Sequence, residues 1–213
     1  LIAASGTYAF GEAYRSVLDP SVWGAITLKS ITPEPRPGNS GRRIQECHGG
    51  LLNSIGLANP GLDEFEKTII PQLADLDTVV IASLAGSATS DYVKLADALQ
   101  QHAVIDAFEL NLSCPNVREG GLAFGADPEK IETLVGQVRR ATAKPLLVKL
   151  TPNVTSIADT VRAAEAGGAD VIVMCNTFLG MDIDLNTGRP VFNNIYAGFS
   201  GPPVFPIALR CVH

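Results

Sequence analysis

Cysteine and histidine are scarce in this chain of 213 residues, which contains four cysteines and three histidines. The cysteines, at positions 47, 114, 175 and 211, are widely spaced and form no Cys-x-x-Cys pair. This pattern argues against a structural zinc ion or an iron–sulfur cluster held by this chain alone. Scattered single thiols also fit a reducing compartment better than a disulfide framework, and we therefore expect a cytoplasmic protein with no metal site.

Basic clusters and long apolar runs are also missing. The 16 Lys and Arg residues are outnumbered by 22 Asp and Glu residues, which gives a net charge of −6 and argues against nucleic-acid binding. The apolar stretches have the length of strands, so we expect no membrane span. No basic segment precedes the first residues, so we expect no signal peptide. Hydrophobic residues make up 46% of the chain, which is typical of a well-buried α/β protein with one domain over residues 1–213.

Short apolar runs alternate with amphipathic segments along the chain. We expect strands at residues 23–29, 78–84, 107–112, 146–150 and 170–175, and helices at 62–73, 91–101, 127–142 and 155–166. Asp127 and Pro128 have the order expected of a helix cap and first turn. Residues 30–50 read as a long loop, and residues 171–174 as a parallel strand buried on both faces.

Strand–helix repeats of this kind are built into either a doubly wound open sheet or a (β/α)8 barrel. A dinucleotide-binding open sheet should carry Gly-x-Gly-x-x-Gly after its first strand, and this chain does not. Polar residues instead follow nearly every strand, as they do at the mouth of a TIM barrel. About six of eight strands are present, so we expect an incomplete barrel that lacks a little at the N-terminus and its last units at the C-terminus.

The segment Glu-Leu-Asn-Leu-Ser-Cys-Pro-Asn at 109–116 is the most informative part of the sequence. A strand leads into a tip that offers two carboxamides, a hydroxyl and a thiol, and Pro115 ends the strand because it has no N–H to donate. Loops at strand ends commonly carry catalytic groups. A buried, inert Cys114 beside turn-forming asparagines is the alternative.

Several motifs in order along the chain resemble the class 1 dihydroorotate dehydrogenases, which are FMN-containing TIM-barrel enzymes of pyrimidine biosynthesis. The matching stretches are Ala-Ser-Gly-Thr at 4–7, Thr-Leu-Lys-Ser at 27–30, Arg-Pro-Gly-Asn at 36–39, Asn-Ser-Ile-Gly-Leu-Ala-Asn-Pro-Gly at 53–61, Asn-Leu-Ser-Cys-Pro-Asn-Val at 111–117, Val-Lys-Leu-Thr-Pro-Asn-Val at 148–154, Asn-Thr at 176–177 and Phe-Ser-Gly-Pro at 199–202. The resemblance implies a flavin-dependent oxidation of dihydroorotate to orotate.

Residues 118–125 and 180–184 look most like the heteromeric, NAD-linked class 1B. That resemblance implies a homodimeric core and a partner subunit that carries FAD and a [2Fe–2S] cluster. The fumarate-linked class 1A and the dihydropyrimidine dehydrogenases are the alternative enzymes, although the latter typically have Cys-Pro-His where this chain has Cys-Pro-Asn. A non-catalytic barrel fragment is the alternative outside the enzymes.

The resemblance assigns catalytic roles to Cys114 and Lys149. Cys114 would remove the C5 proton of dihydroorotate while FMN accepts the C6 hydride. Lys149 closes an apolar strand, where an ammonium group needs a negative partner, and it would stabilise the charge of the reduced flavin. The other three cysteines are expected to be bystanders, although the backbone at Cys175 should lie against the flavin.

The remaining site residues also come from the resemblance. The implied substrate-binding residues are Lys29, Asn53, Ile55, Gly56, Leu57, Asn111, Asn116, Asn176 and Thr177. The implied cofactor-binding residues are Ser5, Gly6, Lys29, Ser30, Ser83, Asn111, Lys149, Cys175 and Gly201.

Two departures from the family pattern bear on flavin binding. Ser83 replaces an asparagine that often contacts the flavin ring, and its shorter side chain would lose that contact or bridge it through water. The Gly-rich loops that would follow the seventh and eighth strands, where such barrels bind phosphate, are absent from the sequence. We therefore expect the isolated 213-residue chain to bind FMN weakly or not at all.

Overall fold

The computed structural model describes residues 1–12, 14–112 and 124–213. Its main body is a parallel sheet of six strands in the order β1-β2-β5-β6-β7-β8. These strands are β1 (Ile2–Ala3), β2 (Ala25–Thr27), β5 (Val79–Leu84), β6 (Ala107–Asn111), β7 (Leu146–Lys149) and β8 (Val171–Val173). The prediction of about six parallel strands is confirmed.

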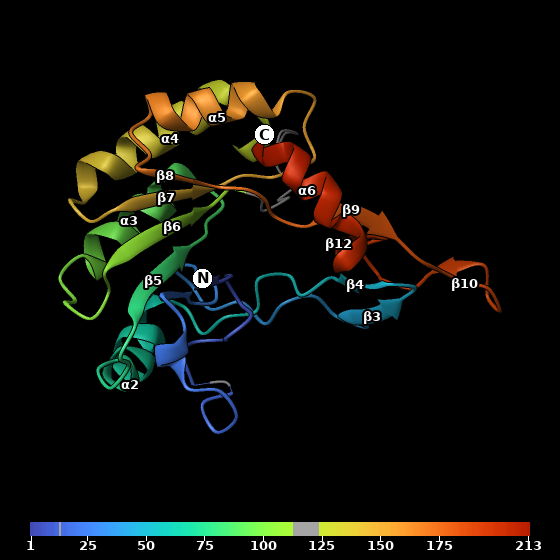
Figure 1. Cartoon of the computed structure of the whole chain (residues 1–213), viewed down its shortest axis with the longest axis horizontal. Helices are drawn as coiled ribbons and strands as arrows, with labels where there is room; N and C mark the ends of the chain where they lie inside the picture. Colours follow the sequence, from blue (N-terminus) through green and yellow to red (C-terminus); the bar gives the residue numbers. More distant parts are fainter. Residues whose placement is uncertain (13, 113–123) are drawn as a thin grey trace.

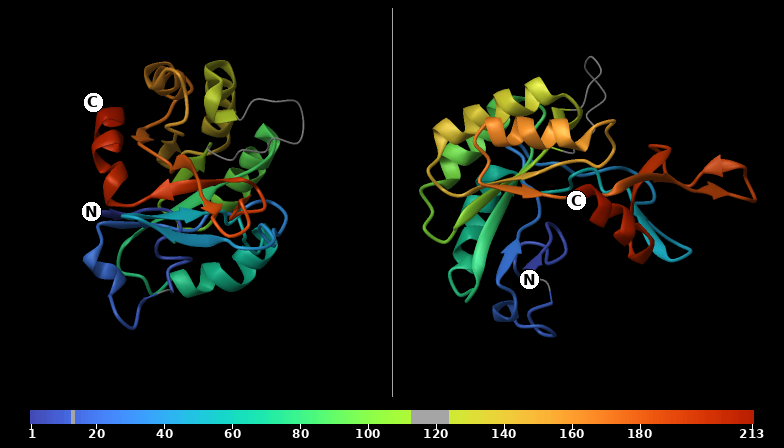
Figure 2. Two further views of the ribbon diagram at one scale, coloured as in Figure 1. Left: turned by 90° about the vertical axis from the view of Figure 1, so that its right-hand side faces the viewer. Right: turned by 45° about the horizontal axis from the view of Figure 1, so that its top comes forward.

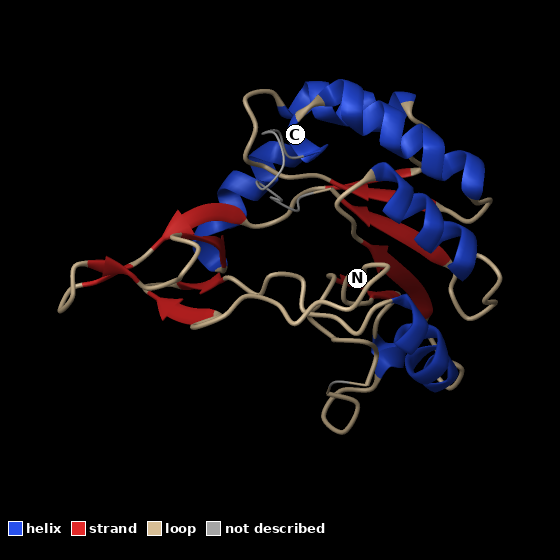
Figure 3. Ribbon diagram, turned by 180° about the vertical axis from the view of Figure 1, so that it is seen from behind, coloured by secondary structure: helices blue, strands red, loops and turns tan. Residues whose placement is uncertain are grey.

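Helices cover the convex outer side of this curved sheet (Figure 1, Figure 3). They are α1 (Leu62–Glu64), α2 (Ile70–Leu73), α3 (Thr89–Leu99), α4 (Pro128–Ala141) and α5 (Ile157–Ala166). A π-helical stretch over Phe65–Ile69 joins α1 to α2, so the helix expected at 62–73 is continuous. Strands inside and helices outside are the arrangement of an incomplete (β/α)8 barrel.

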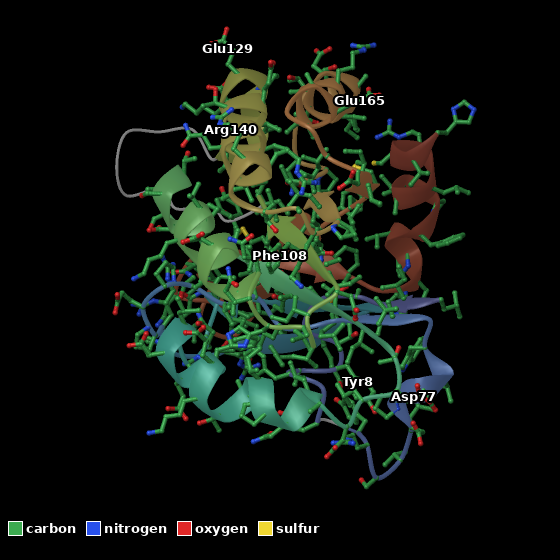
Figure 4. The ribbon with its side chains drawn as sticks, turned by 90° about the vertical axis from the view of Figure 1, so that its left-hand side faces the viewer. Tyr8, Asp77, Phe108, Glu129, Arg140 and Glu165 are labelled. Carbon is green, nitrogen blue, oxygen red and sulfur yellow. The ribbon has the colours of Figure 1, made fainter. Side chains whose placement is uncertain are left out.

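Helix α4 shows how the sequence specifies this layer. The Asp127 side chain accepts hydrogen bonds from the backbone N–H groups of Glu129 and Lys130, as an N-cap should, and Pro128 follows it. Apolar residues at helical spacing then face the sheet: Ile131, Leu134, Val135 and Val138. Figure 4 shows Phe108 of β6 in the interior, whereas Glu129, Arg140 and Glu165 lie on the outer helices.

The inner face of the sheet changes from apolar to polar along the strands. Ala25, Ile81, Ala107 and Leu147 form a small apolar cluster on this face. Side chains alternate between the two faces of a strand, so the next inward residues are Ser83 on β5, Glu109 and Asn111 on β6, and Lys149 on β7. The apolar cluster thus forms the floor beneath a polar layer at the C-terminal ends of the strands.

A second, antiparallel sheet projects from the barrel (Figure 1, Figure 2). Its strands follow the order β3-β4-β12-β9. They are β3 (Ile44–Cys47), β4 (Gly50–Asn53), β9 (Phe178–Met181) and β12 (Tyr196–Ser200). A hairpin of β10 (Ile183–Asp184) and β11 (Arg189–Pro190) extends beyond this sheet. The prediction of a loop over residues 30–50 was therefore wrong at its end. The strand β4 pairs with β12 almost 150 residues later, and no local pattern reports such a partner.

The prediction that residues 171–174 are buried on both faces was also wrong. Val171 is 47% exposed, because β8 is the outermost strand of the parallel sheet in the part of the chain that the structure describes. Short 3-10 helices occur at Pro20–Val22, Phe124–Ala126 and Pro202–Val204, and the helix α6 (Phe205–Val212) lies near the last residue.

Candidate active site

Polar side chains from four strand ends meet in one hydrogen-bonded cluster. The hydroxyls of Ser30 and Ser83 lie 2.7 Å apart. Asn111 Nδ2 donates to Ser30 Oγ over 3.0 Å, and Asn176 Nδ2 donates to Asn111 Oδ1 over 3.3 Å. Four residues that the sequence analysis placed in the site are therefore brought together at the ends of β2, β5, β6 and β8.

The segment after β8 is fixed by its own side chains. The Thr177 backbone N–H donates to Asn176 Oδ1 over 2.8 Å, which determines that the Asn176 amide nitrogen points toward Asn111. Asn153 Nδ2 donates to the Thr177 carbonyl over 3.1 Å, and Asn153 Oδ1 accepts from the Leu179 N–H over 2.9 Å. Asn153, from the motif at 148–154, therefore connects the barrel mouth to the start of β9.

The second sheet brings Asn53 to the same mouth. Asn53 ends β4, and its Nδ2 donates to the Gly198 carbonyl of β12 over 3.2 Å. A Cβ atom at Gly198 would lie only 2.2 Å from Thr177 Oγ1, so glycine is required where Thr177 approaches the strand. Asn53 and Thr177 thus meet at one point of β12.

The loop after β4 has an unusual backbone. Gly56 and Leu57 have φ angles of +73° and +54°, a conformation that is uncommon for leucine. Hydrogen bonds hold the loop on both sides: Asn39 N–H donates to the Ile55 carbonyl over 3.0 Å, and Asn59 Nδ2 donates to the Leu57 carbonyl over 2.7 Å. Strained backbone held in this way is concentrated at ligand-binding sites.

The ends of β1 and β2 are tied to each other. Ser5 Oγ donates to the Leu28 carbonyl over 2.9 Å, and the Lys29 N–H donates to the Ala9 carbonyl over 2.8 Å. Gly6 has a φ of +81°, and no atom lies within 4 Å of where its Cβ would be. The backbone at Gly6 therefore faces open space in which a ligand can approach it.

Lys149 ends β7 opposite Asn111 and is half-buried. Glu109 lies two residues before Asn111 on the same face and is only 2% exposed. Burial raises the pKa of the Glu109 carboxyl, while the nearby Lys149 ammonium and a hydrogen bond from Ser83 partly offset that rise. The charge of Lys149 thus acts on Glu109, a residue that the sequence analysis did not single out; one acid within an otherwise apolar strand was the available signal.

Two of the expected site residues, Cys114 and Asn116, lie outside the described residues. Cys175 lies beyond β8 and is half-buried; burial, followed by the neighbouring Cys211, raises the pKa of its thiol to about 11.

Among the described residues, no group of three or more His, Cys, Asp or Glu side chains could hold a metal ion. None of the described helices is long and apolar enough to cross a membrane.

Gly201 lies apart from the strand-end cluster, at the end of β12. Its φ is +126°, and a Cβ atom there would lie 2.8 Å from Gly50 Cα and 3.0 Å from the Gly49 carbonyl oxygen. Packing of β12 on the turn before β4 therefore explains this glycine. Its role in cofactor binding stays a prediction.

The chemistry of this donor set suits a planar, anionic heterocycle. Carboxamides both donate and accept, and hydroxyls adapt to either role, so they can satisfy ring amides without adding charge. Lys29 and Lys149 supply positive charge at the same edge of the sheet. The open space at Gly6 and the half-buried Lys149 are the features that fit a flavin ring.

The sequence is similar to known proteins along its whole length. The family model for dihydroorotate dehydrogenase matches residues 1–213. Two bacterial proteins named "Dihydroorotate dehydrogenase B (NAD(+)), catalytic subunit" are similar over all 213 residues: one from Geobacillus kaustophilus is 46% identical, and one from Bacillus pumilus is 45% identical. The chain covers 68% and 69% of their respective lengths.

A solved structure shows the same fold. DHODH from Eimeria tenella, crystallised in complex with ferulenol, superposes with a TM-score of 0.76 at 19% sequence identity. The match covers 99% of this chain and 64% of the Eimeria chain. The chain therefore spans about two thirds of the length of the proteins it matches.

Proposed function

This chain belongs to the dihydroorotate dehydrogenase family, and we propose that the whole protein oxidises dihydroorotate to orotate in pyrimidine biosynthesis as an NAD-linked catalytic subunit. The family consists of oxidoreductases. The observation that carries the proposal is the cluster of asparagine and serine side chains at the strand ends, in a chain 46% identical over its full length to a relative with that name.

Substrate recognition is assigned to the amides around the barrel mouth. Asn53, Asn111 and Asn176 can each donate to and accept from the ring amides of the substrate. Asn116, Thr177, Lys29 and the backbone at residues 55–57 complete the proposed set. Lys29 adds a positive charge suited to the substrate carboxylate.

The cofactor proposed for this site is FMN, which when bound supplies the acceptor for the substrate hydride. The residues that would hold it are Ser5, Gly6, Lys29, Ser30, Ser83, Asn111, Lys149, Cys175 and Gly201. Lys149 would place its ammonium where negative charge accumulates on reduction, and a fixed positive charge is effective there because Lys149 is half-buried.

Cys114 is the proposed general base. It follows the strand that carries Asn111, and it would take the C5 proton on the side of the substrate ring away from the flavin. A thiol has an ordinary pKa of about 8.5, so only a minor fraction is thiolate at neutral pH unless the site lowers that pKa.

The relatives' names describe catalytic subunits, and we propose that this chain also works with an electron-transfer subunit. FAD and a [2Fe–2S] cluster would reside in that partner, and two copies of the catalytic chain would form a homodimeric core. Free thiols at Cys47, Cys175 and Cys211 fit a reducing compartment such as the cytoplasm.

The test is expression of the whole protein with and without its partner subunit. We expect a bound flavin spectrum that dihydroorotate bleaches in either preparation, and reduction of NAD only with the partner present. Equal activity with fumarate and no partner would favour the fumarate-linked class instead. Bound flavin that dihydroorotate fails to bleach would contradict the proposed substrate.

A further inference from the structure

The polar side chains at the strand ends form one chain of hydrogen bonds with a direction. The Thr177 N–H donates to Asn176 Oδ1 over 2.8 Å, which leaves Asn176 Nδ2 to donate to Asn111 Oδ1 over 3.3 Å. Asn111 Nδ2 in turn donates to Ser30 Oγ over 3.0 Å. Each amide therefore accepts on the Thr177 side and donates on the Ser30 side.

The hydrogen bonds of Ser30 and Ser83 continue in the same direction, toward Glu109 on β6. Ser83 donates its single hydroxyl proton to Glu109 Oε1 over 3.5 Å, the longest contact of the chain. Ser83 must then accept at its 2.7 Å contact with Ser30, so Ser30 is the donor there. Every donor points from Thr177 toward Glu109. A backbone N–H can only donate and a carboxylate can only accept, so the two ends set the direction.

We propose that Glu109 is a positioning residue, which acts through Ser83 and Ser30 to fix the direction in which Asn111 and Asn176 present their amides to the substrate. The proposal rests on the proposed function of this site. Glu109 itself lies two residues before Asn111 in the polar layer and is 2% exposed, so its effect on the substrate is indirect.

The surroundings of Glu109 support a positioning role for its carboxyl. Its neighbours in register are Ser83 on β5 and Leu147 on β7, and the apolar cluster that includes Ala107 lies directly below. Within the described residues Glu109 forms no salt bridge, although the charge of Lys149 acts on it. Burying a carboxyl costs free energy, and a leucine would fill the same space without that cost. What the carboxyl contributes is therefore an acceptor for the Ser83 hydroxyl.

The test compares orotate binding to the whole, FMN-loaded protein, measured by the change in flavin absorbance. Glu109→Leu removes the terminal acceptor, and we expect orotate to bind about tenfold more weakly, as for one unsatisfied buried hydrogen-bonding group. Glu109→Gln retains an acceptor oxygen and should bind within about twofold of wild type. Leu147→Val is the matched control, because Leu147 is the register neighbour of Glu109 on β7 and its replacement alters packing without removing any of these hydrogen bonds.

Ser83→Ala interrupts the same series of hydrogen bonds one residue nearer to Asn111. If Glu109→Leu does not fold, this variant tests the proposal instead. Its effect and that of Glu109→Leu should not add in the double variant. Unchanged orotate affinity in both variants would overturn the proposal, and an equal loss in Leu147→Val would do the same.

A second measurement separates this inference from the proposed function. In protein labelled with ¹⁵N-asparagine and free of flavin and orotate, Glu109→Leu or Ser83→Ala should shift the side-chain amide signals of Asn111 and Asn176, and Leu147→Val should not. Unmoved signals would overturn the inference. Failure of the wild-type protein to bind orotate would count against the proposed function alone.

Discussion

Asn176 and Asn111 form a side-chain hydrogen bond of 3.3 Å between the ends of two strands that are not neighbours. The strand β7 lies between them in the sheet, and its last residue, Lys149, pairs with Asn111 on one side and Val173 on the other. The hydrogen bond between the two amides therefore crosses the C-terminal end of β7, at Lys149. This arrangement places a positive charge next to a pair of oriented amides.

Replacing Lys149 with methionine should lower the reduction potential of bound flavin. The variant keeps the apolar stem and removes the charge that favours the reduced, anionic form. A tenfold change in the two-electron equilibrium corresponds to about 30 mV, and we expect a decrease of at least this order in a dye-coupled titration. Lys130→Met is the control, because Lys130 lies on α4 in a salt bridge with Asp127. Equal potentials in the two variants would contradict the role of Lys149.

Replacing Cys114 with alanine should slow flavin reduction by dihydroorotate by a factor of about 10² to 10⁴, the usual contribution of a general base. In the wild-type protein the rate should rise with pH through the ionisation of the thiol. Rapid-mixing measurements of flavin bleaching across a pH series test both statements. Cys47→Ala should behave as wild type, and a Cys114→Ala rate that is unchanged at every pH would exclude Cys114 as the base.

Replacing Glu109 with glutamine should change how stability depends on pH. Burial raises the pKa of the Glu109 carboxyl in the folded chain above its ordinary value. As pH rises above that value, the unfolded carboxyl ionises first, so the folded wild type loses stability until the pH passes the raised pKa. The free energy of unfolding of Glu109→Gln relative to wild type should therefore increase over this window and then level off. Denaturant titrations at several pH values measure it, and a flat difference would contradict the assigned direction.

Cys175 should react slowly with iodoacetamide in the folded protein. Its thiol is half-buried, and burial together with Cys211 raises its pKa to about 11, so little thiolate exists at pH 8 to 9. Mass spectrometry after timed alkylation should show much faster modification of Cys175 in denaturant than in buffer. Comparable rates in the two conditions would show that the thiol is neither shielded nor neutral.

The barrel strands and helices could be predicted from sequence because their signals are local. The apolar residues of α4 recur at helical spacing, and Asp127 and Pro128 mark its start. The second sheet could not be predicted in this way. Its strands are short and half exposed, and β4 finds its partner β12 only through the fold.

The candidate site shows the same division. Motifs placed Ser30, Asn111 and Asn176 at strand ends, and the parallel sheet brings them together. Glu109 was missed as a site residue because its significance depends on what lies across the strands, namely Ser83 on one side and the charge of Lys149 nearby. A strand sequence reports which face a residue occupies, and only the register reports its neighbours.

The pairing of β4 with β12 has a consequence for biosynthesis. Asn53 leaves the ribosome long before Gly198, whose carbonyl is its hydrogen-bond acceptor in the folded chain. The mouth of the barrel is therefore completed late, by a contact of very large sequence separation, and such closures are slow because chain entropy opposes them. A nascent chain halted before residue 198 would carry the early barrel strands with β4 paired only to β3, and Asn53 would lack its acceptor on β12.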